Sequence, residues 1–168
     1  RNRVVFLPGI GFSWKDGSAE VYGNAVRNFR AINFSDIQLT GLGVVVDPDI
    51  RDEFGANFDL GIRKRTESFQ VDFSAYCLLY KERIGLIPAI VPAPPPIFQK
   101  AIFLRKNLND ARTLGVELSL SKQFVINDVL LYCGGSFGVA RGVYIAGDSP
   151  IEGNELEFVP DYTLSLIH

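Results

Sequence analysis

The sequence predicts an all-β protein whose strands run antiparallel, up and down, and are long enough to cross a membrane. Three observations lead to this fold class. Segments of about ten residues alternate apolar and polar side chains along most of the chain. The connections between these segments alternate between short and long. Basic residues occur on the apolar face only where a segment ends, which is where charge on a lipid-facing side costs little.

The composition is that of a folded protein rather than a disordered or nucleic-acid-binding one. Of the 168 residues, 47% are hydrophobic and the net charge is only −2, so the chain lacks the basic surplus of a nucleic-acid binder. The 16 glycines and 9 prolines favour strands joined by many turns. No apolar run approaches the roughly 18 residues that a membrane helix needs, so a membrane could be crossed only by strands. Because the chain has no methionine, we expect an internal segment or a processed product.

The individual strands follow from the alternation, taken in chain order. The first two segments flank the tight turn 16–18, although the alternation of the second is blurred. The third and fourth flank the polar turn 64–68 and alternate cleanly. The fifth and sixth flank a turn at 123–128 that contains Asn127 and Asp128, and the seventh is short. We expect seven strands, at about 6–15, 19–30, 54–63, 69–80, 112–122, 129–141 and 161–168.

The remaining residues form three long connections, at about 31–53, 82–111 and 142–160. The second of them carries the stretch Pro92-Ala93-Pro94-Pro95-Pro96. Proline cannot donate a hydrogen bond to a sheet, so we expect a loop with a short polyproline II run there. Short and long connections that alternate in this way favour a membrane barrel over a soluble β-sandwich.

The borders of the apolar segments carry the residue types of a membrane interface. Long basic side chains can reach the headgroups from a lipid-facing position, and aromatic residues gather at both interfaces of a barrel. The basic border residues are Lys64, Lys81, Arg112, Lys122 and Arg141. The aromatic border residues are Trp14, Phe69 and Phe124 on the short-turn side, and Phe29, Phe54, Tyr80, Phe158 and Tyr162 on the long-loop side. A soluble β-sandwich with the apolar face as its core remains the alternative.

Few residues in the chain are suited to catalysis or metal binding. The only histidine is the terminal His168, so a Ser-His-Asp triad and a Cys/His metal site have no natural place. We therefore expect no enzyme, no catalytic residue, no cofactor and no metal site. Cys77 and Cys133 fall on the fourth and sixth strands, about 9–10 Å apart, which is too far for a disulfide.

An acidic cluster in the first long connection could in principle hold Ca²⁺. Its members are Asp47, Asp49, Asp52 and Glu53. They lack the spacing of a known calcium loop, so a solvated acidic loop is the better interpretation.

Four segments, which together span most of the chain, form a recognisable series. They are YGN at 22–24 with RNFRAINF at 27–34, VDPDIRDE at 46–53 with NFDLGIR at 57–63, RTLGVE at 112–117, and GNEL at 153–156 with VPDYT at 159–163. In this order they resemble segments of the barrel of TonB-dependent receptors, and the resemblance is greatest to receptors of the ferric-citrate and siderophore type.

The resemblance implies an integral protein of the Gram-negative outer membrane that imports a ferric chelate, such as iron(III) dicitrate or another siderophore. It implies a barrel of 22 strands filled by an N-terminal plug, with energy supplied through TonB. We expect residues 1–168 to form part of that barrel, with the plug and the closing C-terminal strands outside them. The implied partners are outer-membrane lipid, the protein's own plug, TonB and the ferric chelate, but no nucleic acid.

Two groups of residues are candidates for functional contacts. Asp59, Asp72 and Glu117 lie on the polar faces of their strands, so we expect them to face the lumen, where either basic plug residues or water would meet them. The long loops supply the candidates for ligand contact, which are Asn33, Asp47 and Asn154. Two other functions stay open for the sequence, a soluble sandwich that acts as a binding module and the wall of a passive porin.

Overall fold

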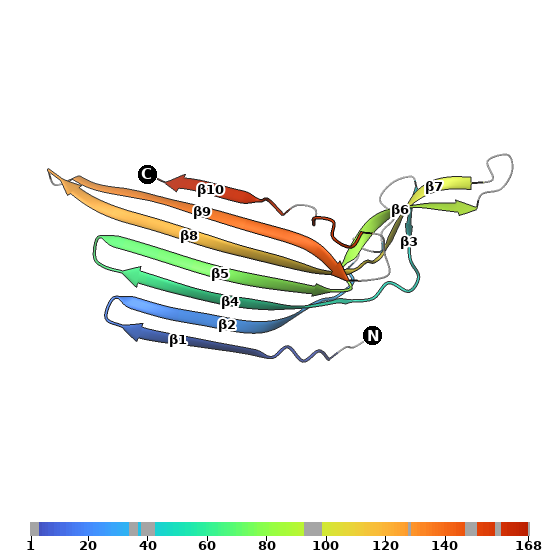
Figure 1. Ribbon diagram of the computed structural model, residues 1–168, viewed down its shortest axis with the longest axis horizontal. Coiled ribbons are helices and arrows are strands. Elements are labelled where there is room, and N and C mark those ends of the chain that lie inside the picture. The colour runs from blue at the N-terminus through green and yellow to red at the C-terminus, as the bar shows by residue number, and fades with distance from the viewer. Residues whose placement is uncertain are drawn as a thin grey trace.

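The computed structural model of the chain contains a long sheet and a small sheet beyond one end of it (Figure 1). No helix among the described residues is long and apolar enough to span a membrane. The expectations for Ala93–Pro96, Asp128, Phe158 and His168 lie outside the described residues. The structure describes residues 4–33, 37, 43–92, 99–127, 129–146, 151–156 and 159–167.

Seven strands form the long sheet, in the order β1-β2-β4-β5-β8-β9-β10. Every neighbouring pair is antiparallel. This confirms the predicted fold class and the up-and-down arrangement, with the first and last strands as open edges of the sheet. The seven strands are β1 (Gly9–Asp16), β2 (Ala19–Arg30), β4 (Glu53–Arg65), β5 (Phe69–Lys81), β8 (Asp110–Ile126), β9 (Val129–Ala146) and β10 (Tyr162–Ile167).

The three short connections are hairpin turns at one end of the long sheet, on the left in Figure 1. The first turns at Gly17, whose φ of 58° lies in the left-handed region that favours glycine. In the second, the Thr66 hydroxyl accepts a hydrogen bond of 3.1 Å from the Phe69 backbone N–H. The third is tighter than the predicted span of 123–128, because β8 continues to Ile126 and the chain turns at Asn127 with a φ of 48°.

The register divides the long sheet into two faces, because paired residues share a face and successive residues alternate. One face is apolar in every strand. It includes one complete row across the sheet, from β1 to β10, that consists of Trp14, Val21, Ile62, Phe73, Leu118, Phe137 and Leu164. The alternation that was blurred in the second segment is thus resolved by its partners, because Val21 pairs with Trp14 and Ile62.

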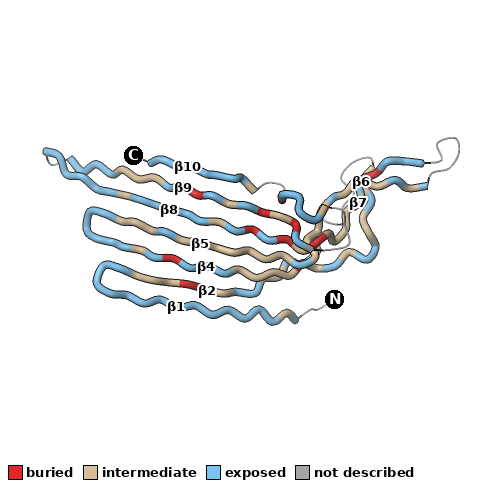
Figure 2. Tube along the Cα trace, viewed as in Figure 1, coloured by how far each residue is buried: buried red, intermediate tan, exposed pale blue. Residues whose placement is uncertain are grey.

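The large side chains of the apolar face are exposed or partly exposed rather than buried, and few positions along the seven strands are buried (Figure 2). Trp14 is 63% exposed, Leu60 is 56% exposed and Phe137 is 48% exposed. A continuous exposed apolar surface of this kind marks an interface with lipid or with another protein. In a sandwich a second sheet would cover this face, whereas the second sheet described here lies beyond the strand ends (Figure 1).

The basic border residues lie on the apolar face, as predicted. At the short-turn end, Lys64 pairs with Val71, and Lys122 pairs with Phe69. Lys81, Arg112 and Arg141 lie at the opposite end, in rows that contain Phe54, Leu79 and Leu114. The aromatic border is confirmed for Phe54 and Phe69, but Tyr80 was wrongly grouped with it. Tyr80 pairs with Ala111 on the polar face and packs against a buried cluster.

The prediction that 82–111 is an irregular loop is wrong, because this segment contains a hairpin. Its strands are β6 (Ile84–Pro92) and β7 (Gln99–Asn107), and β3 (Val44–Val46) pairs in parallel with β7. Pro88 and Pro92 are tolerated because β6 is an edge strand of this sheet, so the missing N–H groups can face its open side. We call β3, β7 and β6 the loop-end sheet.

A small core lies where the loop-end sheet joins the long sheet. Ala111, Tyr144 and Leu156 are buried there, and Tyr80 and Leu108 pack against them. The long strands otherwise bury little, which is expected of a wall one sheet thick. The two cysteines are free, as predicted, and the strand register explains why they cannot form a disulfide. Cys77 lies opposite Leu114 and Cys133 lies opposite Lys122 on the intervening strand β8, so the two are far apart along the strands as well.

Candidate functional site

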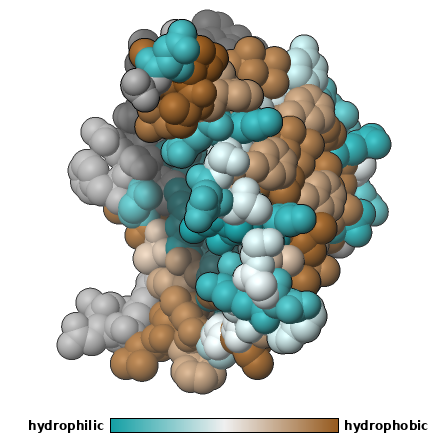
Figure 3. Space-filling view, turned by 90° about the vertical axis from the view of Figure 1, so that its left-hand side faces the viewer, coloured by the Kyte–Doolittle hydropathy of each residue, from teal (hydrophilic) through white to brown (hydrophobic). Residues whose placement is uncertain are grey.

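The polar face of the long sheet carries the three carboxylates that the sequence placed toward a lumen. Asp59 lies on β4, Asp72 on β5 and Glu117 on β8, and the register puts all three on the face opposite the apolar rows. Figure 3, which looks at the short-turn end, shows hydrophilic side chains in the centre and a hydrophobic patch to their right.

Two tyrosines on this face lie across glycines of the neighbouring strand. Tyr22 pairs with Gly61, and Tyr76 pairs with Gly115. A Cβ atom added at either glycine would lie 2.3 Å from the Cζ atom of the tyrosine ring, so only glycine leaves room for the ring. Each ring therefore lies against the backbone of its glycine, and the Tyr22 hydroxyl reaches past β4 to Asp72 on β5.

Asp72 is held in a network that crosses β2, β4 and β5. The Tyr22 hydroxyl donates to Oδ1 of Asp72 over 2.7 Å, and Nε of Arg63 donates to Oδ2. The Arg63 guanidinium also lies over the Tyr22 ring, with 4.9 Å between Cζ and the ring centroid. Both carboxylate oxygens of Asp72 are thus engaged within the wall.

The network extends to β1 through Glu20. The Ser13 hydroxyl donates to Oε1 of Glu20 over 2.6 Å, and Lys15 and Arg63 each approach its Oε2 to 3.9 Å. Four strands are linked by side chains in this way near the short-turn end. The network would not have been found from the sequence, because it depends on the register of four strands.

Asp59 and Glu117 differ from Asp72 in their surroundings. Among the described residues neither forms a salt bridge or a side-chain hydrogen bond. Glu117 is exposed and borders two hollows of the polar face, of about 380 Å³ and 230 Å³, together with Ser74, Tyr76 and Thr163. These two carboxylates, rather than Asp72, are available to a partner that approaches the polar face.

Asn107, which the sequence did not single out, forms three of the hydrogen bonds that join the loop-end sheet to the segments beside the wall. Its Nδ2 donates to the backbone oxygens of Arg51 and Glu82, over 2.9 and 2.7 Å, and its Oδ1 accepts from the Arg51 N–H over 2.7 Å. Arg51 and Glu82 also form an ion pair of 2.8 Å. The polar run Asn107-Leu108-Asn109-Asp110 was the sequence signal for such a junction.

The acidic cluster of the first long connection serves these local contacts. Asp47 accepts the Asp49 N–H over 2.9 Å, Asp52 accepts the Ile32 N–H over 3.0 Å, and Glu53 pairs with Arg30 over 2.9 Å. Within the part of the chain that the structure describes, no three His, Cys, Asp or Glu residues are grouped so that they could hold a metal ion.

The three candidate ligand residues lie at the loop end, on different elements. Asn33 follows β2 and is exposed. Asp47 follows β3, and its N–H donates to the Arg105 oxygen of β7 over 2.9 Å. Asn154 is exposed, and its backbone oxygen accepts from the Tyr144 N–H of β9 over 3.0 Å.

A wall of antiparallel strands with one lipid-compatible face and one polar face defines a segment of a membrane β-barrel. Residues 1–167 match the family described as TonB dependent receptor-like, beta-barrel. The chain belongs to this family, which places it in an integral barrel of the outer membrane.

Comparison with solved structures agrees on the fold. The chain is similar to the protein named copper transporter OprC, with a TM-score of 0.68 and 16% sequence identity over 95% of this chain. The matched region covers 23% of the OprC chain, so this chain spans about a quarter of that protein's length. No curated protein sequence matches the chain.

Proposed function

We propose that the protein is an active-transport receptor of the outer membrane that imports a ferric chelate and is powered through TonB. This chain supplies part of the barrel wall and of the extracellular loops. The observation that carries the proposal is the match of residues 1–167 to the receptor-barrel family, on a sheet with one lipid-compatible face and one polar face. We propose no catalytic role for the segment.

The polar face is suited to hold a plug domain. A basic plug residue that approached the wall would meet the carboxylates of Asp59 and Glu117, which are not engaged by described cations. Asp72 is neutralised by Arg63 and serves to join β4 to β5. Asp59 and Glu117 would therefore be plug contacts, and TonB would act through that plug.

The loop end is suited to meet the ligand. Short turns of bacterial barrels face the periplasm and long loops face the exterior, so the loop-end sheet would lie at the extracellular mouth. Asn33, Asp47 and Asn154 lie at that end and would contact the chelate. Iron(III) dicitrate and other ferric siderophores remain the proposed ligands, since the copper in the name of OprC belongs to a protein only 16% identical.

A passive porin wall is the second candidate function, because the same two-faced sheet would serve it. The two functions differ in whether uptake depends on TonB and the proton gradient, which a receptor needs and a porin does not. Uptake of ⁵⁵Fe-citrate by cells that carry the complete receptor should stop when TonB is deleted or the proton gradient is collapsed. Uptake that persists without TonB would favour the porin, and receptor-dependent uptake of copper without uptake of the ferric chelate would overturn the substrate.

The same assay tests the plug contacts. The double variant Asp59→Asn, Glu117→Gln should keep the barrel folded but increase hydrogen exchange of the plug and reduce uptake. Ser119→Ala, on the same face of β8, is the matched control and should leave both unchanged. If the double variant behaves as the control does, the two carboxylates face water and not the plug.

A further inference from the structure

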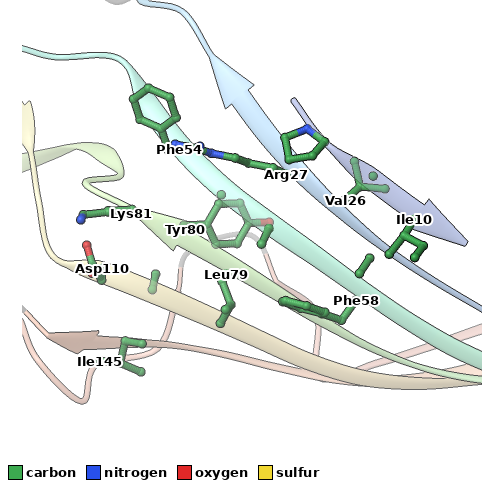
Figure 4. A pocket seen from close by; sticks show the side chains of 16 residues that line it. Ile10, Val26, Arg27, Phe54, Phe58, Leu79, Tyr80, Lys81, Asp110 and Ile145 are labelled. Atoms are coloured by element: carbon green, nitrogen blue, oxygen red, sulfur yellow. The ribbon is translucent and has the colours of Figure 1, made fainter. Parts of the chain in front are cut away.

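A hollow of about 640 Å³ opens on the apolar face at its loop end (Figure 4). It crosses β1, β2, β4, β5 and the start of β8, and it reaches the end of β9. Its sides are formed by large apolar residues, namely Ile10, Phe54, Phe58, Leu79 and Ile145. The small side chains of Ala25 and Ala56 and the backbone of Gly55 line its floor. Ala56 lies between Phe54 and Phe58 on the apolar face of β4, and Ala25 lies opposite Phe58 on β2, so two small side chains leave space beside the two rings.

Two cations line the hollow, and two more lie in the same part of the apolar face. Arg27 pairs with Ala56, and its guanidinium lies over the Phe54 ring, with 5.2 Å between Cζ and the ring centroid. Lys81 pairs with Phe54. Arg112 and Arg141 follow on β8 and β9, in rows that contain Leu79 and Leu114. All four side chains are exposed.

These four cations are not neutralised within the described part of the chain, where no salt bridge involves them. One carboxylate, Asp110, also lines the hollow. Its Oδ1 accepts the Glu82 N–H over 3.0 Å, so it contributes to the junction with the loop-end sheet. The border of the hollow therefore carries a surplus of positive charge.

The hollow lies on the side of the wall that a complete barrel leaves in contact with lipid. Further strands would pair with β1 and β10, and a plug would cover the polar face, but neither would cover the apolar face. Because the loop end faces the exterior, the hollow lies at the level of the outer leaflet. A ligand that fits must combine an apolar chain with negative charge at the interface.

We propose that the hollow is a binding site for a phosphorylated glycolipid of the outer leaflet. One acyl chain occupies the space above Ala25 and Ala56, and a phosphate lies between Arg27 and Lys81. Arginine binds phosphate through paired hydrogen bonds, and lysine binds it as a point charge. The four cations extend from β2 to β9 over four strand spacings, about 19 Å, which suits an amphiphile with two phosphates better than one with a single phosphate. The site rests on placement in the outer membrane and not on the transport function.

Native mass spectrometry of the complete receptor with added lipid A, a bisphosphorylated and multiply acylated disaccharide, tests the site. The expected result is a bound lipid A that dephosphorylated lipid A and phosphatidylglycerol do not replace. The double variant Arg27→Gln, Lys81→Gln should reduce the bound fraction about tenfold or more. The matched control Lys64→Gln, Lys122→Gln removes two cations from the same face at the short-turn end and should stay within about twofold of the parent.

A third variant separates the acyl chain from the phosphate. Ala56→Leu fills the floor of the hollow without changing charge, and it should lower lipid A retention several-fold while the barrel melts at the parent temperature. The proposed site would be overturned if the double variant Arg27→Gln, Lys81→Gln and the single variant Ala56→Leu both retained as much lipid A as the parent. Equal binding of dephosphorylated lipid A would overturn the role of the phosphates. Iron uptake reports separately on the transport function.

Discussion

Asp59 and Asp72 lie on the same face of adjacent strands, yet the side chains around them differ. Asp72 accepts hydrogen bonds from Tyr22 and Arg63, whereas Asp59 forms no such contact among the described residues. The alternation of the sequence predicted the face of both residues. The alternation could not predict which of the two aspartates forms side-chain contacts, because the partners of Asp72 come from two other strands whose register was unknown.

Asp72→Asn should lower the stability of the barrel, whereas Asp59→Asn should not. Loss of a charged hydrogen bond costs about 1.5–3 kcal/mol, and the partial exposure of Arg63 places the effect near the lower value. A substitution away from such a contact typically changes stability by less than about 0.5 kcal/mol. Unfolding of the complete barrel in detergent, followed by circular dichroism, measures both variants. Equal midpoints for Asp72→Asn and Asp59→Asn would contradict the network.

The tyrosine–glycine pairs are a second feature at the scale of single residues. Gly115→Ala should destabilise the barrel by about 1–3 kcal/mol, because the new methyl group would overlap the Tyr76 ring and displace it. The control is Gly11→Ala, where the nearest atom lies at 3.5 Å, an ordinary contact. The same unfolding measurement compares them. Once Tyr76→Ala has removed the ring, the further loss of stability caused by Gly115→Ala should be much smaller. If the effects of the two substitutions on stability simply add, the overlap is refuted.

Among the strands, the sequence predicted those whose side chains alternate with a period of two residues. It missed the strands that can be recognised only from their pairing with distant segments. The seven strands of the wall alternate with period two, so their existence and order were predictable. β6 and β7 were hidden by Pro88, Pro92 and the proline run between them. β7 pairs with β3, which lies far away in the chain, and neither segment alone reveals this pairing.

The junction of the loop-end sheet depends on Asn107. Asn107→Ala removes three hydrogen bonds of about 1 kcal/mol each, so the hairpin β6–β7 should open more readily while the wall stays folded. Hydrogen exchange of the backbone amides in the complete receptor measures this opening. Exchange should increase in β6 and β7 and stay unchanged in β4 and β5. Lys100→Ala, an exposed site on β7, is the control, and equal exchange in the two variants would show that the junction does not depend on Asn107.

At the scale of the whole molecule, a wall with two open edges should not persist alone. Its edges expose unpaired N–H and C=O groups, and its apolar face is exposed to solvent. Residues 1–168 expressed alone should therefore aggregate or require detergent, and should bind ferric citrate weakly. Size-exclusion chromatography without detergent, followed by a ferric-citrate titration, checks this. A monodisperse soluble monomer would instead support the sandwich that the sequence left open.

We expect alternate residues of each strand to face lipid and lumen in the complete barrel. Nitroxide labels placed singly at Phe58, Asp59, Val116 and Glu117 of the complete receptor in lipid bilayers test this expectation most directly, after replacement of Cys77 and Cys133 by alanine. Collision rates with oxygen, which concentrates in lipid, should be high at 58 and 116 and low at 59 and 117. Equal oxygen accessibility at neighbouring positions, or the inverse pattern, would contradict the account of this chain as a membrane-barrel wall.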